Sequence, residues 1–208
     1  MRIVFMVFLS LDGVYQGPGA PDEDRSDGFE RGGWLVPFID PVFEERATEW
    51  TAGATGFLFG HRTYDAFGAI WPTITDPADD NARQLNSRPK WVVATTPVEP
   101  IWGPVEIIGE DHAERIEALK RETDGELQIH GSGRLGRSLL ELGLVDELRI
   151  VTAPVVVGQG RRLFADTAAP LALELASQER TRPGLVLSRY LVRGEGAVGA
   201  YVRGVTNL

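Results

Sequence analysis

The chain is built from short apolar runs that alternate with segments of helical period. Residues 3–9 and 55–59 are almost uniformly apolar, which predicts two strands buried on both faces. A helix is predicted over residues 41–53, because Asp40 precedes a proline as an N-cap does and apolar residues recur at i, i+4 and i+7 from Phe43. The first half of the chain therefore alternates strands with helices.

The same pattern continues to about residue 160 and then changes. Further strands are predicted at residues 90–94, 105–108, 126–130 and 146–152, and further helices around residues 79–85, 113–125 and 135–142. Apolar and polar residues then alternate over 171–177 and 185–192, which predicts an antiparallel pair, and residues 197–202 offer a final edge strand. We predict a single α/β domain over residues 1–208 with three layers, in which helices cover both faces of a mixed, mostly parallel central sheet with an antiparallel edge.

One long segment does not fit this alternation. Residues 17–33, GPGAPDEDRSDGFERGG, are rich in Gly, Pro and Asp and show no apolar period, which predicts an exposed and mobile loop. A loop of this length inside a compact domain is often a lid over a site, and the alternative is a surface insertion without a role.

Two strand-to-helix turns are candidates for binding phosphate. The strand at 126–130 stops at Gly131-Ser132-Gly133, and small residues there expose the N-terminus of the next helix, where free N–H groups and the helix dipole favour an anion. The turn at residues 60–64, GHRTY, repeats this arrangement with basic side chains, and hydroxyl groups follow another strand at Thr95 and Thr96. The alternative is a pair of turns without a ligand.

Composition narrows the possible partners. The chain has 208 residues, 43% of them hydrophobic, and a net charge of -9, which argues against a nucleic acid or an anionic membrane as partner. It has no cysteine, which excludes disulfides, thiolate nucleophiles and cysteine-ligated metals, and three scattered histidines predict no metal site. The first residues lack the features of a signal peptide, so we expect a cytoplasmic protein.

Five motifs together resemble one known family. They are SLDG at residues 10–13, GHRTY at 60–64, GSG at 131–133, LELGLVDE at 140–147 and PVVVGQGRRLF at 154–164. The chain thereby resembles the dihydrofolate reductase-like superfamily, in particular the group that contains the reductase domain of bacterial riboflavin biosynthesis. The resemblance covers most of the chain and implies a dihydrofolate reductase-like fold.

The resemblance implies a reductase that binds NADPH. Gly131, Ser132 and Gly133 would hold the pyrophosphate, and Arg134 would add positive charge. The adenosine phosphates would lie near a second set of residues, namely Gly60, His61, Arg62, Thr63, Thr95 and Thr96. For Arg62, which can donate bidentate hydrogen bonds to a phosphate, the alternative is a surface ion pair.

The sequence identifies polar residues near the reacting atoms less specifically than it identifies the cofactor residues. Asp12 is the first catalytic candidate, with Ser10 as a hydrogen-bonding neighbour, although an Asp before Gly is also a common turn former. Asp40 is a second carboxylate candidate on the substrate side, because dihydrofolate reductases carry their substrate acid on the first helix, and its alternative role is the N-cap.

The presumed substrate side is aromatic. Substrate contacts are predicted for Tyr15, Asp40, Tyr64 and Trp71, with core packing as the alternative for the aromatic rings. This set favours a flat, weakly charged heterocycle and departs from the ribityl phosphate that the riboflavin reductase recognises. We therefore predict an NADPH-dependent reductase that acts on a small heterocyclic or carbonyl compound by hydride transfer and has a role other than riboflavin synthesis. The alternative is a non-catalytic nucleotide-binding or ligand-sensing protein on the same fold.

The late strands predict an oligomer. They leave an open sheet edge, and such an edge is a common site of pairing between chains. A homodimer is therefore expected.

Overall fold

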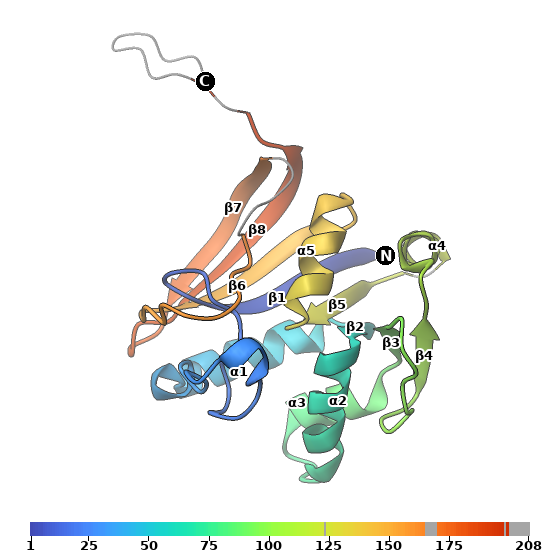
Figure 1. Ribbon diagram of the computed structural model, residues 1–208, viewed down its shortest axis with the longest axis horizontal. Coiled ribbons are helices and arrows are strands. Elements are labelled where there is room, and N and C mark those ends of the chain that lie inside the picture. The colour runs from blue at the N-terminus through green and yellow to red at the C-terminus, as the bar shows by residue number, and fades with distance from the viewer. Residues whose placement is uncertain (123, 165–169, 198, 200–208) are drawn as a thin grey trace.

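A computed structural model describes residues 1–122, 124–164, 170–197 and 199 and shows one central sheet (Figure 1). Its eight strands among these residues are β1 (Arg2–Ser10), β2 (Gly56–Gly60), β3 (Lys90–Val93), β4 (Val105–Ile108), β5 (Glu126–His130), β6 (Glu147–Ala153), β7 (Leu171–Arg180) and β8 (Val186–Glu195). They are ordered β4-β3-β2-β5-β1-β6-β8-β7. The strands from β4 to β6 are parallel, and β8 is antiparallel to both β6 and β7, which confirms the predicted mixed sheet with an antiparallel edge.

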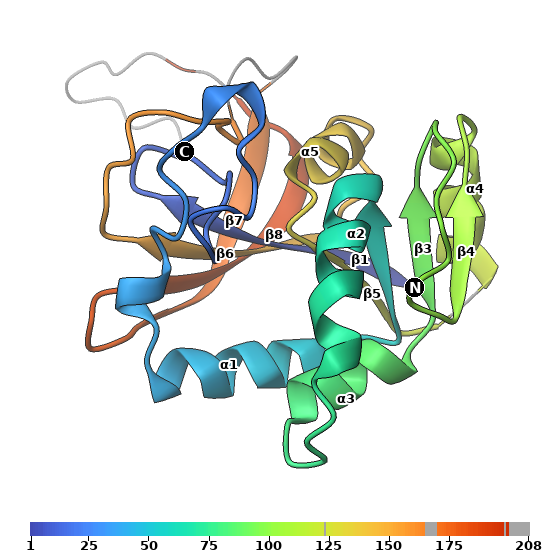
Figure 2. The same ribbon diagram turned by 60° about the horizontal axis from the view of Figure 1, so that its bottom comes forward.

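Helices cover both faces of the sheet. They are α1 (Pro41–Ala52), α2 (His61–Ile70), α3 (Asp80–Ser87), α4 (His112–Glu122) and α5 (Gly133–Glu141). Apolar side chains of α4 and α5 share one core with β1 and β5, whereas those of α1, α2 and α3 pack in two clusters on the opposite face. Figure 2 shows α1 and α2 on this same side of the sheet. The three layers are therefore those that the sequence predicts.

The long loop has an apolar anchor that its composition did not reveal. Residues 17–33 contain a short 3-10 turn, Ser26–Gly28, followed by Phe29, which is only 2% exposed and packs in the core beneath α1. Trp34 Nε1 donates to Gln16 O at 2.8 Å and closes the base of the loop. The predicted mobility of the loop stays a prediction, but any movement would have to carry or release Phe29.

One predicted strand cannot be compared with the structure, because residues 197–202 fall almost wholly outside the described residues. No helix in the described part of the chain is long and apolar enough to cross a membrane.

Candidate functional site at the carboxyl edge of the sheet

The two predicted phosphate turns meet at the carboxyl edge of the parallel strands. β2 ends at Gly60 and β5 ends at His130, and the two strands are direct neighbours. The backbone N–H of Gly60 donates to Ser132 Oγ at 3.0 Å, so the turn after β2 is tied to the turn after β5. The sheet thus places two helix N-termini side by side, in the crevice where open α/β sheets bind their ligands.

The turn after β5 needs its small residues. Gly131 and Ser132 have φ angles of 57° and 46°, in the left-handed region that favours glycine. Gly133 begins α5 directly against Tyr15, and a Cβ there would lie 2.5 Å from Tyr15 Cε2. Thr63 forms the other wall of the turn, because its Cγ2 lies 3.5 Å from the Cβ position of Gly131.

Both helices at this edge begin without a side-chain cap. The Ser132 hydroxyl, which precedes α5, makes no capping hydrogen bond, and Gly60 before α2 has no side chain to cap with. By contrast, Asp40 caps α1 through Phe43 N, and Asp79 caps α3 through Ala82 N. The first N–H groups of α2 and α5 are therefore left for a ligand or for water.

Other predicted cofactor residues lie around these helix ends. His61 Nδ1 lies 3.0 Å from Thr96 Oγ1, so the turn after β2 is joined to the turn after β3. Thr95 is exposed beside it, and Arg134 is exposed in the first turn of α5. The structure therefore brings the predicted cofactor residues to one edge, while their contact with a cofactor stays a prediction.

Arg62 reaches the long loop, where a second arginine meets it. Arg62 Nη1 lies 3.3 Å from Ser26 Oγ, and Arg161 Nη1 donates to the same oxygen at 2.7 Å. Arg161 also pairs with Asp24 and Asp27 of the loop. Arg161 escaped prediction because its role depends on the loop folding back over the edge, which no local pattern signals.

Asp12 occupies the centre of a hydrogen-bond network at the end of β1. Its carboxylate accepts from Ser10 Oγ at 2.7 Å and from the backbone N–H groups of Val157 and Gly158, both at 2.9 Å. Arg162 Nη2 completes the set at 3.0 Å. The Ser10 hydroxyl, aided by the other donors, lowers the pKa of Asp12 well below its usual range.

This network anchors a loop rather than presenting an acid. Asp12 ties residues 154–162 to β1 and stays ionised at neutral pH, so it carries no proton to donate. Ser10 is 2% exposed and is committed to Asp12 and to the N–H of Val14. The predicted catalytic role of the two residues stays untested, and their geometry favours the turn-forming alternative.

The four predicted substrate residues are not brought together. Tyr15 lies at the edge, against Gly133. Tyr64 is 0% exposed and its hydroxyl is hydrogen-bonded to Trp102 N and O, so it is a core residue and the substrate contact does not fit its placement. Trp71 follows the last residue of α2, about 15 Å along the helix from its start at the edge. Asp40 has the capping role.

A buried polar network beneath α1 was also missed. Glu126, Gln128 and His130 alternate along β5, which places them on one face, and Gln128 Nε2 donates to Glu126 Oε1 and to Trp50 O. Arg149 of β6 extends the network to Glu126 at 2.8 Å. The alternation of polar residues in an otherwise apolar strand was the signal that would have revealed it.

His130 is the end of this network nearest the candidate site. Because the Gln128 amide nitrogen faces Glu126 and Trp50, its oxygen faces His130 Nε2 at 2.7 Å, and this ring nitrogen must carry the proton. Burial, together with the positive charge of Arg149, lowers the pKa of His130 to about 3. The imidazole is therefore neutral. Among the described residues no group of His, Asp and Glu side chains is suited to a metal ion.

Comparison with known proteins agrees with this arrangement. The chain is 25% identical over 187 residues to the uncharacterized protein YyaP of Bacillus subtilis, covering 89% of this chain and 92% of that protein. A putative riboflavin biosynthesis protein from Shewanella sp. PV-4 has a similar structure, with a TM-score of 0.68 at 21% identity over 93% of this chain and 99% of the other. Dihydrofolate reductase from Enterococcus faecalis, complexed with NADP(H), gives 0.55 at 15% identity over 92% and 96% of the two chains.

These similarities confirm the dihydrofolate reductase-like fold that the motifs implied. The model of one family, the RibD C-terminal domain, matches residues 2–187, which is nearly the whole chain and includes every element that forms the candidate site. The chain belongs to the RibD C-terminal domain family.

Proposed function

We propose that the protein is an NADPH-dependent reductase that acts on a small heterocyclic or carbonyl substrate by hydride transfer. The observation that carries the proposal is the pair of helix N-termini, those of α2 and α5, that lack side-chain caps and are held together by the Gly60 to Ser132 hydrogen bond. Two such ends at one edge suit a ligand with more than one phosphate group. Membership of the RibD C-terminal domain family supports a reductase-type function.

The residues present fit this cofactor. Gly131, Ser132 and Gly133 would hold the pyrophosphate, since their small side chains leave the backbone N–H groups before and at the start of α5 accessible beside Thr63. Arg62 is exposed, and its guanidinium suits the ribose 2'-phosphate that distinguishes NADPH from NADH. When bound, NADPH supplies the hydride.

The chain itself contributes binding and orientation. The ionised Asp12 carboxylate accepts hydrogen bonds from Val157 N and Gly158 N and so holds the 154–162 segment in place at the end of β1. His130, the last residue of β5, is 5% exposed and neutral, so it adds no charge next to the proposed pyrophosphate site. A proton for the reduced substrate therefore comes from water or from the substrate's own groups in this proposal.

Thermal unfolding with and without nucleotides tests the proposal. A ligand present at about a hundred times its dissociation constant stabilises the folded state by about 2.7 kcal/mol. Because only NADPH carries the 2'-phosphate proposed to bind Arg62, NADPH should raise the unfolding temperature more than NADH at the same concentration. No shift with either nucleotide would reject the cofactor site. The second step is to follow oxidation of NADPH with a panel of pterins, flavin precursors and quinones.

A non-catalytic nucleotide-binding or sensing protein is the second candidate. It is favoured by the network around Asp12, which leaves that carboxylate without a transferable proton. Stabilisation by NADPH without its oxidation by any member of the panel would support the sensor and reject the reductase.

The partners follow from charge and from the sheet edge. We propose a small-molecule substrate, no nucleic-acid or membrane partner, a cytoplasmic location and a homodimer. The net charge of -9 supports the statement on nucleic acids and membranes. The homodimer is supported by β7, which is the edge strand of the sheet among the described residues and is exposed along most of its length. Light scattering that gives the mass of one chain at micromolar concentration would reject the homodimer.

A further inference from the structure

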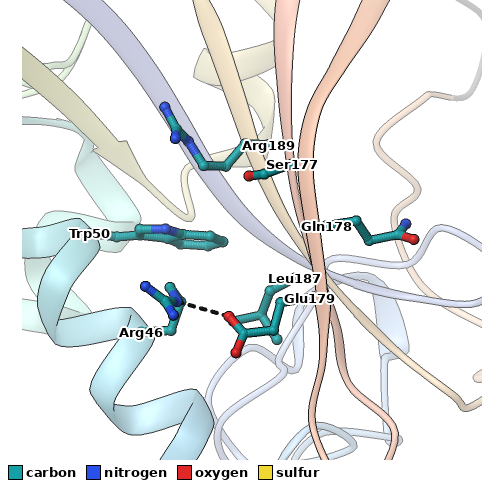
Figure 3. Close-up of a pocket in the computed structure, with 7 residues that line it drawn as sticks. All are labelled: Arg46, Trp50, Ser177, Gln178, Glu179, Leu187 and Arg189. Atoms are coloured by element: carbon teal, nitrogen blue, oxygen red, sulfur yellow. Dashed lines mark hydrogen bonds and ion pairs between the residues drawn. The ribbon is translucent and has the colours of Figure 1, made fainter.

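A cavity of about 430 Å³ lies between α1 and the strands β7 and β8, within the range of roughly 300–1,000 Å³ common for small-molecule sites. Figure 3 shows the side chains that line it, among them Trp50 and Arg46 from α1, Ser177 from β7, and Leu187 and Arg189 from β8. None of the residues assigned above to cofactor or substrate lines this cavity. It is a separate site, and the inference below does not depend on the proposed reductase function.

Trp50 provides a flat apolar wall with a free donor. Its ring points from α1 toward β7 and β8, between Arg46 and Arg189 (Figure 3). The residue is 9% exposed, and its indole Nε1 has no hydrogen-bond partner within the part of the chain that the structure describes. An indole N–H without a protein partner is open to water or to a ligand with an acceptor atom.

An ion-pair cluster that includes the cavity residue Arg189 contains more arginines than carboxylates. Glu147, which is fully buried, is shared by Arg2 at 3.0 Å, Arg149 at 2.9 Å and Arg189 at 2.7 Å. Glu126 pairs with Arg2 and Arg149 as well. Three guanidinium groups thus face two carboxylates; Arg149 and the two carboxylates are buried or nearly so, whereas Arg2 is 44% and Arg189 35% exposed.

Arg189 is the member of this cluster that lines the cavity. Its side chain is 35% exposed, and the contact with Glu147 uses Nε and Nη2, so Nη1 remains for another acceptor. Arg46, on the opposite side of Trp50, pairs with Glu49 and with Glu179, which itself lines the cavity. Arg189 Nη1 is therefore a charged donor at the cavity that the described ion pairs leave unused.

We propose that this cavity binds a small aromatic monocarboxylate, whose ring packs against Trp50 and Leu187 and whose carboxylate accepts hydrogen bonds from Arg189 and the Trp50 indole. A carboxylate offers an acceptor oxygen to each of two unused donors, Arg189 Nη1 and Trp50 Nε1. A flat ring matches the Trp50 wall and the adjoining Leu187.

Benzoate and benzamide are a suitable pair of probes, because they share a ring and differ in charge. Calorimetric titration of the full chain should detect benzoate and show at least about tenfold weaker binding of benzamide, since a hydrogen bond to a charged group contributes about 1.4 kcal/mol or more. Equal binding of the two probes, or no binding of benzoate at millimolar concentration, would overturn the proposal.

Two substitutions on the same strand locate the site. Ser177→Trp places a large side chain in the cavity opposite Arg189, whereas Leu175→Trp places it opposite Tyr190, whose side chain packs on the other face of the sheet. Ser177→Trp should abolish benzoate binding and Leu175→Trp should leave it unchanged. Equal loss in both variants, or equal retention, would overturn the location.

Further variants separate the ligand site from folding and from assembly. Trp50→Phe keeps the flat wall and removes the N–H, so benzoate binding should fall severalfold while the unfolding temperature with no probe stays close to that of the parent chain. Light scattering of the parent and Ser177→Trp chains should give the same mass. A lower mass for Ser177→Trp would mean that a second copy of the chain covers the cavity, and the proposal would then be rejected.

Discussion

Gly133 lies directly beneath the ring of Tyr15, so closely that a Cβ on Gly133 would be 2.5 Å from Tyr15 Cε2. Gly133→Ala should displace Tyr15 from the turn before α5 and weaken NADPH binding about tenfold, because the change alters the proposed pyrophosphate site. Titration of the variant with NADPH measures the effect. The double variant with Tyr15→Ala should bind NADPH better than Gly133→Ala alone, and equal weakness would show that the ring is not the obstacle.

Arg62 tests the choice of nucleotide. Arg62→Ala should weaken NADPH by roughly 10- to 100-fold and NADH much less, because a hydrogen-bonded charge pair with the 2'-phosphate is available only in NADPH. Arg83→Ala, which removes an exposed arginine that is ion-paired within α3, is the matched control. Equal losses for both nucleotides would place Arg62 away from the 2'-phosphate.

Asp12 should make a contribution to the free energy of unfolding that depends on pH. Its pKa is lowered in the folded state by the Ser10 hydroxyl and by the other donors, so its contribution is complete above its ordinary value of 3.8 and is lost as the pH falls below it. Asp12→Asn should reduce the free energy of unfolding at pH 7 by about 2 kcal/mol. Urea unfolding from pH 7 to pH 3 should also show a flatter acid limb for Asp12→Asn than for the parent chain, and parallel curves would contradict the assignment.

His130 should weaken the folded state in mild acid. Because burial lowers its pKa to about 3 from the ordinary 6.5, the unfolded chain binds a proton that the folded chain refuses between these values. Its contribution to stability is therefore present above pH 6.5 and is lost as the pH falls, by at most about 1.4 kcal/mol per pH unit.

NMR and a substitution can check this behaviour. The imidazole of His130 should keep the chemical shifts of the neutral form, with the proton on Nε2, down to pH 5. His130→Asn should give a smaller loss of stability between pH 6.5 and pH 5 than the parent chain. Titration of His130 near pH 6.5 would refute the burial argument, and a proton on Nδ1 in the neutral form would refute the assigned tautomer.

Much of the fold could be predicted from local patterns. The apolar run at residues 3–9 became β1, Asp40 capped α1 as its proline neighbour suggested, and the Gly-Ser-Gly turn after β5 opened α5. These features succeed because a strand buried on both faces, an N-cap and a left-handed turn each place their demands on a few consecutive residues. Their agreement with the family motifs also led to the family to which the chain belongs, that of the RibD C-terminal domain.

The roles of single side chains were less accessible. Tyr64 and Trp71 follow a predicted cofactor turn in sequence, yet α2 carries Trp71 away from the edge and buries Tyr64 against Trp102. Arg161 pins residues of the long loop that are more than 130 positions away. No window of sequence holds both partners of such contacts.

The sequence by itself determined the strands, the helices, the strand-end turns and the absence of cysteine chemistry, because these depend on residue type and on neighbours along the chain. Only the tertiary structure decided that Asp12 is an anchor, that Glu126, Glu147 and three arginines form one ion-pair cluster, and that Trp50 faces a cavity beside β7 and β8. The physical reason is that burial, pKa and hydrogen-bond partners are set by segments that meet only when the sheet assembles.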